Sequence, residues 1–175
     1  AKKAASDSKT SPISKCYKGD ARACVEAGKA SSKGDAITAK KPDLAAKLYT
    51  KGCALASPNA CFQLTLQINK EGVSERTRTS GFETLRAECP KMTGYDRDQC
   101  RYAGVRAIER HAEQTAVPAA SYRLAADFIV LGCKLNDMMA CTLLGEIMVN
   151  GNAGVTDVVA GRDLYHPHSK SRNFS

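Results

Sequence analysis

Apolar residues recur along most of this chain at the three- and four-residue spacing of an amphipathic helix, and nowhere do they alternate for long enough to predict a strand. This spacing predicts helices over residues 20–31, 42–53, 58–70, 76–88, 97–113, 118–133 and 138–149. Residues 1–11 and 166–175 have no such pattern and are expected to be tails. The side chains expected in the core are Leu44, Leu48, Leu64, Leu66, Ile68, Leu85, Val105, Ile108, Leu124, Phe128, Leu143 and Ile147.

Helix-start signals divide these segments into short helices. Ser57 followed by Pro58 is typical of an N-cap with proline at the first helical position. Similar signals stand at Asp20, at Asp96 and at Asn136 with Asp137, while Pro42 and Pro118 precede the helices that run to Cys53 and Cys133. The Gly-rich stretch "VNGNAGVTD", residues 149–157, is expected to be a turn. The pattern therefore predicts about four helical hairpins.

The hairpins repeat in sequence. "LAAKLYTKGC" at 44–53 matches "LAADFIVLGC" at 124–133, and "GFETLRAEC" at 81–89 fits the same frame more loosely. "ACVEAGK", "ACFQLTL", "QCRYAGV" and "ACTLLGE" follow the pattern after the second cysteine of each pair. The first cysteines of the four pairs lie 37, 36 and 44 residues apart. A period of this size is typical of a helical solenoid, so we expect an all-α protein.

All eight cysteines fall into close pairs in sequence. Residues eight apart in one continuous helix are separated by roughly 12 Å, whereas a disulfide needs Cα atoms within roughly 7 Å. A bond within a pair therefore requires the chain to reverse between its cysteines. Eight cysteines allow 105 pairings, and the repeat narrows them because one local bond per turn is the only scheme that every unit can use. The expected disulfide residues are Cys16, Cys24, Cys53, Cys61, Cys89, Cys100, Cys133 and Cys141.

Three other states of the cysteines stay open at this point: zinc ligands, free thiols and a catalytic dithiol. Zinc sites usually have cysteines separated by two to four residues, and no such pair exists here. Free thiols would suit a reducing compartment, but the pairing of all eight cysteines argues against them. A catalytic dithiol normally has the spacing Cys-x-x-Cys, which does not occur in this sequence. Disulfides are favoured, each worth roughly 2.5 kcal/mol in the chain-entropy model, and with them an oxidising compartment and no cofactor.

Composition limits the kind of core and of partner. Without tryptophan, the core must consist mostly of Ala, Leu, Val and Ile. The net charge is +8, and residues 1–51 hold 12 Lys and Arg against 5 Asp and Glu. A nucleic-acid surface would offer arginines and stacking aromatics, so we expect no nucleic-acid partner. We interpret this region as a lysine-rich solvated face, with an anionic partner as the alternative.

No apolar run approaches the roughly 18 residues of a membrane span. Because the chain begins at Ala1, we expect a processed product.

Catalytic motifs are weak. The only Ser-x-x-Lys string is "SDSK", residues 6–9, in the expected tail. His166 and His168 lack a third ligand nearby, and His111 stands among charged residues that indicate a solvated face. No glycine-rich phosphate loop precedes a helix. We therefore expect no catalytic residue and no metal site.

The stretch "LAAKLYTKGCALASPNACFQL", with its Gly-Cys-x7-Cys register, resembles the Sel-one-like repeat family, a cousin of the tetratricopeptide repeats. It is most similar to the disulfide-stapled, cysteine-rich branch, which includes secreted Helicobacter proteins and a mitochondrial intermembrane-space assembly factor. The similarity covers about residues 16–164. The long Cys89–Cys100 spacing and Thr65 in place of glycine depart from the family pattern.

The resemblance implies a right-handed superhelix of α/α hairpins over residues 16–165, preceded by a basic segment 1–15 and followed by a tail 166–175. It also implies a non-enzymatic adaptor for a protein or peptide. An acidic partner is the alternative use of the lysine-rich first unit. The alternatives are a protein that binds cell-wall fragments or β-lactams, with at most weak hydrolase activity, and an intermembrane-space assembly factor. We expect secretion or a periplasmic location. The register of the first helices suggests Gln63, Gln67, Asn69, Arg101, Glu146 and Asn150 as binding residues.

Overall fold

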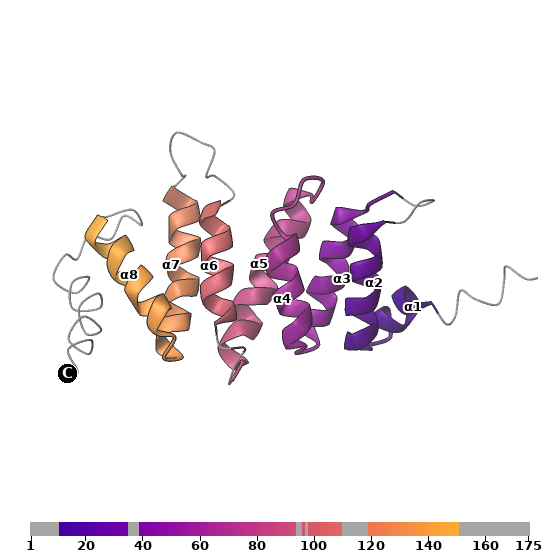
Figure 1. Cartoon of the computed structure of the whole chain (residues 1–175), viewed down its shortest axis with the longest axis horizontal. Helices are drawn as coiled ribbons and strands as arrows, with labels where there is room; N and C mark the ends of the chain where they lie inside the picture. Colours follow the sequence, from indigo (N-terminus) through magenta and orange to yellow (C-terminus); the bar gives the residue numbers. More distant parts are fainter. Residues whose placement is uncertain (1–10, 35–38, 94–95, 97, 110–118, 151–175) are drawn as a thin grey trace, which may run out of the picture. The chain divides into compact units, whose positions relative to one another are not determined.

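The computed structural model describes residues 11–34, 39–93, 96, 98–109 and 119–150 (Figure 1). Within these ranges all regular structure is helical, and there is no strand. The chain divides into two compact units, residues 1–91 and 92–175, and each is described by itself. The expectation of an all-α protein is confirmed for the described part of the chain.

The first unit packs its helices as a helical repeat does. Each helix contacts the next one along the chain, and α1 also contacts α3, α2 contacts α4, and α3 contacts α5. Because contacts run to the next helix and the one after it, no helix has to bury its apolar face alone. The elements are α1 (Pro12–Tyr17), α2 (Ala21–Lys33), α3 (Pro42–Ala54), α4 (Pro58–Gln67), α5 (Glu75–Glu88) and the short 3-10 helix η1 (Cys89–Lys91).

Small side chains fill much of this unit. Ala45, Ala46 and Ala60 are completely buried, as are Leu48 and Leu64. Alanines let helix axes approach closely, which suits a chain without tryptophan. The core of the first unit is therefore rich in alanine and closely packed.

The second unit contains a three-helix block of the same design. Its described helices are α6 (Gln99–Glu109), α7 (Ala119–Lys134) and α8 (Met138–Asn150), and α7 contacts both of the others. Phe128 and Ala125 are completely buried, and Ile129 nearly so. The block corresponds to α2, α3 and α4 of the first unit, because the same cysteine and glycine positions recur in both.

Three short connections are built alike. In each, the third residue after the first cysteine has a positive φ: 101° at Gly19, 58° at Ala56 and 62° at Asn136. The left-handed conformation ends one helix and turns the chain back. The backbone N–H of this residue donates to the carbonyl of the first cysteine in all three, at 3.0, 2.8 and 2.9 Å respectively. This conformation produces the chain reversal that a disulfide within each cysteine pair requires.

The next residue of each connection caps the following helix. The side chains of Asp20, Ser57 and Asp137 each accept a hydrogen bond from the backbone N–H three residues later, at 2.9, 3.3 and 3.2 Å. The second cysteine then falls in the first turn of the new helix. Cα atoms of the bonded cysteines are 4.5 Å apart in Cys16–Cys24 and 4.6 Å apart in both Cys53–Cys61 and Cys133–Cys141.

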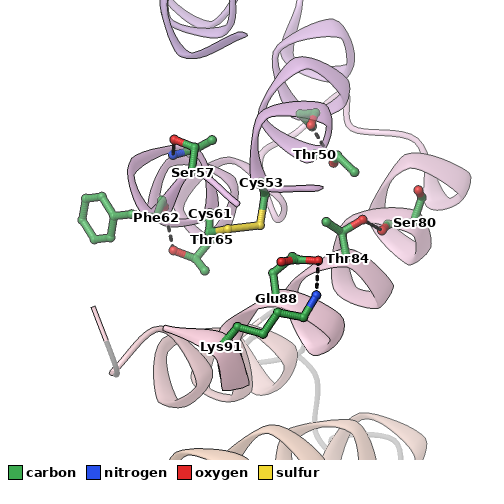
Figure 2. The surroundings of a disulfide bond; sticks show 12 residues. Thr50, Cys53, Ser57, Cys61, Phe62, Thr65, Ser80, Thr84, Glu88 and Lys91 are labelled. Atoms are coloured by element: carbon green, nitrogen blue, oxygen red, sulfur yellow. Dashed lines mark hydrogen bonds and ion pairs between the residues drawn. A yellow bond between two sulfur atoms is a disulfide. The ribbon is translucent and has the colours of Figure 1, made fainter. Parts of the chain in front are cut away.

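Cys89 and Cys100 are also disulfide-bonded, so the protein has four disulfides and no free cysteine. Figure 2 shows the Cys53–Cys61 disulfide joining α3 to α4, with the ring of Phe62 directed away from it. In the three pairs with seven residues between the cysteines, each cysteine is thus bonded to its neighbour in sequence, as the repeat predicted.

The glycine of the Gly-Cys motif has a packing role. A Cβ on Gly52 would lie 2.8 Å from the Cβ of Ala60 and 2.9 Å from that of Cys24. A Cβ on Gly132 would lie 2.9 Å from the Cβ of Ala140, the residue equivalent to Ala60. Glycine and alanine therefore face each other beside each of these disulfides, because the helices approach too closely there for larger side chains.

Several sequence predictions need correction. Leu66 was expected in the core but is 40% exposed, because residues 64 and 68 face the core and a residue midway between them points to the opposite side of the helix. The helix expected over 58–70 ends at Gln67, and the one expected over 97–113 begins at Gln99, so Asp96 is not its cap.

Other expectations are met only in part. Helix α1 was not predicted, and it begins inside the segment expected to lead into the repeats. Five expected core side chains are only partly buried: Leu44, Val105, Ile108, Leu124 and Leu143. Pro118, the turn after residue 150 and most of both expected tails lie outside the described residues.

The shared turn geometry predicts opposite effects for two reciprocal substitutions. Ala56→Gly should raise the free energy of unfolding by roughly 0.5–1 kcal/mol, because glycine adopts a positive φ without steric cost. Gly19→Ala should lower it by roughly 1 kcal/mol, and since no atom lies within 4 Å of the added Cβ, the loss would come from the backbone alone. Urea unfolding of the oxidised variants measures both. If both substitutions changed the free energy of unfolding in the same direction, the positive φ at residues 19 and 56 would not be what determines their stability.

The cap residues predict unequal losses at equivalent positions. Ser57→Ala should cost about 1 kcal/mol, the usual value of a lost N-cap. Asp137→Ala should cost about 3 kcal/mol, because it also removes the nearer carboxylate partner of the largely buried Arg101, at 2.9 Å, and leaves only Asp98 at 3.6 Å. Asp137→Asn keeps a capping oxygen and should fall between the two. Thermal unfolding of the three oxidised variants tests this order, and equal losses would show that the ion pair adds nothing.

Candidate functional site

An open cleft of about 530 Å³ lies in the first unit, where α1, α3 and the start of α5 meet. Helix α3 supplies one continuous strip of the lining, because its lining residues are spaced three and four apart and so share one face. Tyr17 comes from the end of α1. The lining residues are Tyr17, Lys47, Thr50, Lys51, Ala54, Ser74, Arg76, Thr77 and Ser80.

The cleft is basic. Three of its lining residues are cations and none is Asp or Glu. Lys47 is paired with Asp43 at 2.7 Å, one turn earlier on α3. Lys51 and Arg76 have no ion-pair partner among the described residues. Two positive charges on facing helices are therefore available to an anionic ligand.

Hydroxyl groups surround these cations, but most are already used. Thr50 donates to the carbonyl of Ala46 at 2.8 Å (Figure 2), and the Ser74 and Thr77 hydroxyls are hydrogen-bonded to each other at 2.9 Å. The side-chain hydroxyls of Ser80 and Tyr17 have no hydrogen-bond partner within the described ranges. These two donors can turn toward a ligand.

Asp43 fixes the edge of the cleft. Its Oδ1 accepts from the backbone N–H of Ser74 at 2.9 Å and from the Ser74 hydroxyl at 2.8 Å. Burial alone would raise the pKa of Asp43, but hydrogen bonds from Lys47, Thr77 and Ser74 outweigh it and hold the pKa well below its usual range. Because Ser74 also caps α5, Asp43 ties the start of α3 to the start of α5.

None of the residues predicted from the sequence to bind a partner is among the residues that line this cleft. Gln67 is 5% exposed, with hydrogen bonds to Ser32 at 2.9 Å and to the Pro42 carbonyl at 3.2 Å. Arg101 is engaged by Asp137 and lies over the Tyr102 ring. Both therefore hold their own unit together. Gln63 and Asn69 are partly buried in or after α4, and Glu146 and Asn150 are exposed on α8, so their binding role stays a prediction.

Other candidate groups are distributed as follows. The "SDSK" string, His111, His166 and His168 lie outside the described residues. Among residues that the structure describes, no three His, Cys, Asp or Glu side chains gather as metal ligands. The described helices include none that is long and apolar enough to cross a membrane.

Sequence reasoning missed the cleft although part of its signal was present. The charge excess of residues 1–51 includes Lys47 and Lys51, one helical turn apart on α3. Their relation to Arg76 depends on the packing of α3 against α5, two helices further along the chain. The resemblance directed attention instead to residues on or directly after α4, on α6 and on α8.

The chain matches no protein-family model, and no curated protein or solved structure shows significant similarity to it. The resemblance noted in the sequence therefore stays a prediction.

The network around Asp43 predicts a pH-dependent contribution to stability. With a pKa lowered in the folded state, the ionised carboxylate stabilises the fold above about pH 4, and this contribution is lost as the pH falls through the folded-state pKa. Asp43→Asn should therefore be less stable than the parent protein by roughly 1 kcal/mol at neutral pH, with a smaller gap in acid. Urea unfolding at several pH values measures it. The control is Glu26→Gln, which removes the exposed pair with Arg22 and should change little.

Proposed function

We propose that this protein is a non-enzymatic binding scaffold that presents its first unit to a protein or peptide partner in an oxidising compartment. The basic cleft between α1, α3 and α5 carries this proposal, because it combines unpaired cations with an open surface. Four disulfides support the choice of compartment, since such bonds persist outside reducing cytosol. The proposed arrangement of the repeats is a right-handed solenoid of the Sel-one-like type.

The helical framework suits recognition. All but one of the cleft's lining residues stand on helices, and the remaining one, Ser74, caps α5. Residues on packed helices keep a fixed spacing, so a ligand does not have to order them on binding. The Cys53–Cys61 disulfide fixes the end of α3 next to the cleft residue Ala54. Secretion or a periplasmic location is part of the proposal, with the mitochondrial intermembrane space as the alternative.

A small carboxylate ligand is the second candidate. A volume of about 530 Å³ falls within the usual range of small-molecule sites, and free cations suit a cell-wall fragment or a β-lactam carboxylate as well as a peptide. This alternative predicts saturable binding of a muramyl peptide or of a chromogenic β-lactam, with at most slow hydrolysis.

Capture of partners from the native source tests the scaffold proposal. The oxidised protein serves as bait, and the reduced and alkylated protein serves as the control. We expect at least one protein to be enriched by the oxidised form only, because reduction removes the bonds that hold the helix ends together. The enriched protein, once purified, should bind the oxidised form directly in calorimetry.

Two results would overturn the proposal. If neither bait enriches a protein and the muramyl peptide binds instead, the small-ligand alternative replaces it. If the oxidised protein turns over a chromogenic β-lactam, the description as non-enzymatic is wrong. Both assays use the same preparation of the full chain.

A further inference from the structure

The positive charges of the cleft are arranged in two places. Lys51 stands in the last turn of α3, and Arg76 stands in the first turn of α5. Lys51 is partly buried, whereas Arg76 is exposed. Since Lys47 is already neutralised by Asp43, a ligand would meet two separate cations on different helices. A ligand with two separated carboxylates matches this pattern better than one with a single compact charge.

Apolar surface lies among these charges. The cleft lining includes Tyr17, which is 59% exposed, together with Ala54 and Thr50. The stems of the lysines add further methylene surface. A small inorganic anion would leave this surface in water, and a nucleic-acid backbone would need a longer row of cations. An apolar or aromatic side chain carried between two acidic residues would cover it.

We infer that the cleft takes an acidic peptide segment of the partner, in which carboxylates pair with Lys51 and Arg76 and an apolar side chain lies against Tyr17 and Ala54. This inference rests on the proposed function and names the chemistry of its ligand. The hydroxyls of Ser80 and Tyr17 donate to the peptide carbonyls or carboxylates.

Fluorescence anisotropy of the oxidised full chain tests the inference with defined peptides. The probe is a labelled peptide of sequence Gly-Asp-Glu-Leu-Glu-Asp-Gly. Its first comparison peptide has every carboxylate replaced by the amide, and its second has glycine in place of the leucine. We expect saturable binding of the probe, with affinity lowered roughly tenfold or more in the amide peptide and about fivefold in the glycine peptide. Raising the salt concentration should weaken binding because it screens exposed charges.

Charge-reversal variants locate the binding. The double variant Lys51→Glu, Arg76→Glu should bind the probe peptide with an affinity roughly a hundredfold lower, about tenfold for each cation. The matched control is Lys29→Glu with Lys33→Glu, which makes the same change of net charge on the exposed surface of α2 and should leave binding within about twofold. Tyr17→Ala should lower the affinity for the probe about fivefold, whereas Ile13→Ala, one turn earlier on α1, should leave it unchanged. Circular dichroism of each variant verifies its folding.

The outcomes separate this inference from the proposed function. If the control pair weakens binding as much as the cleft pair, binding follows net charge and the inference is wrong. If inorganic phosphate, anionic phosphatidylglycerol vesicles or a muramyl peptide compete as well as the probe, the cleft recognises a different ligand and the inference is also wrong. If a partner is captured equally by the parent protein and by the Lys51→Glu, Arg76→Glu variant, the scaffold function stands and only this assignment of the cleft fails.

Discussion

A chain reversal completed between two cysteines eight residues apart sets the geometry of this protein. The reversal needs one residue with a positive φ, and the residue after it must cap the next helix. These conditions bring paired Cα atoms within 4.6 Å, which a disulfide can join. Helices joined so closely leave no room for large side chains beside the bond, so Gly52 faces Ala60 and Gly132 faces Ala140. Backbone conformation, capping, packing and covalent linkage are thus four aspects of one connection.

Helix α3 serves the scaffold and the candidate site at once. The side that carries Gly52 and Cys53 packs against α2 and α4, and the side with Lys47 and Lys51 lines the cleft. Asp43 at its start is tied to the cap of α5. Because both sides belong to one rigid helix, the position of the cleft residues depends on the same packing that surrounds the disulfides. Loss of the Cys53–Cys61 bond would therefore disturb the end of α3 next to Ala54.

The cysteine pattern was the most informative part of the sequence. A disulfide between cysteines eight residues apart excludes one continuous helix. The turn and cap residues between the cysteines then locate the reversal. Leu66 was wrongly predicted to be in the core. Leu64 and Ile68 lie on the buried face of this segment, and the sequence does not show which of two opposite apolar faces packs against the other helices. Helix α1 was missed because six residues are too few for a periodic pattern. The cleft could not be found because it joins residues of three helices, and contacts between a helix and the next but one have no signature in local sequence.

Chemistry at the candidate residues was harder to predict than their location on helices. Gln67 and Arg101 fell on the expected helices, but a buried amide with two partners and a cation held by Asp137 are committed within the fold. Polar residues of either type look the same in sequence whether they face a ligand or a neighbouring helix. Lys51 shows the reverse case: an ordinary lysine in a basic region becomes notable only because the described structure gives it no carboxylate partner.

The short sequence separation of the disulfides has a consequence for biogenesis. Each of the three pairs separated by eight residues closes a loop that lies within two adjacent helices, so its cysteines meet as soon as that hairpin forms. Such local contacts give low contact order and quick closure. In an oxidising compartment, each of these hairpins can therefore form its disulfide without waiting for contacts from the rest of the chain. Once its hairpin has formed, the nearest partner of every cysteine in these pairs is its native one.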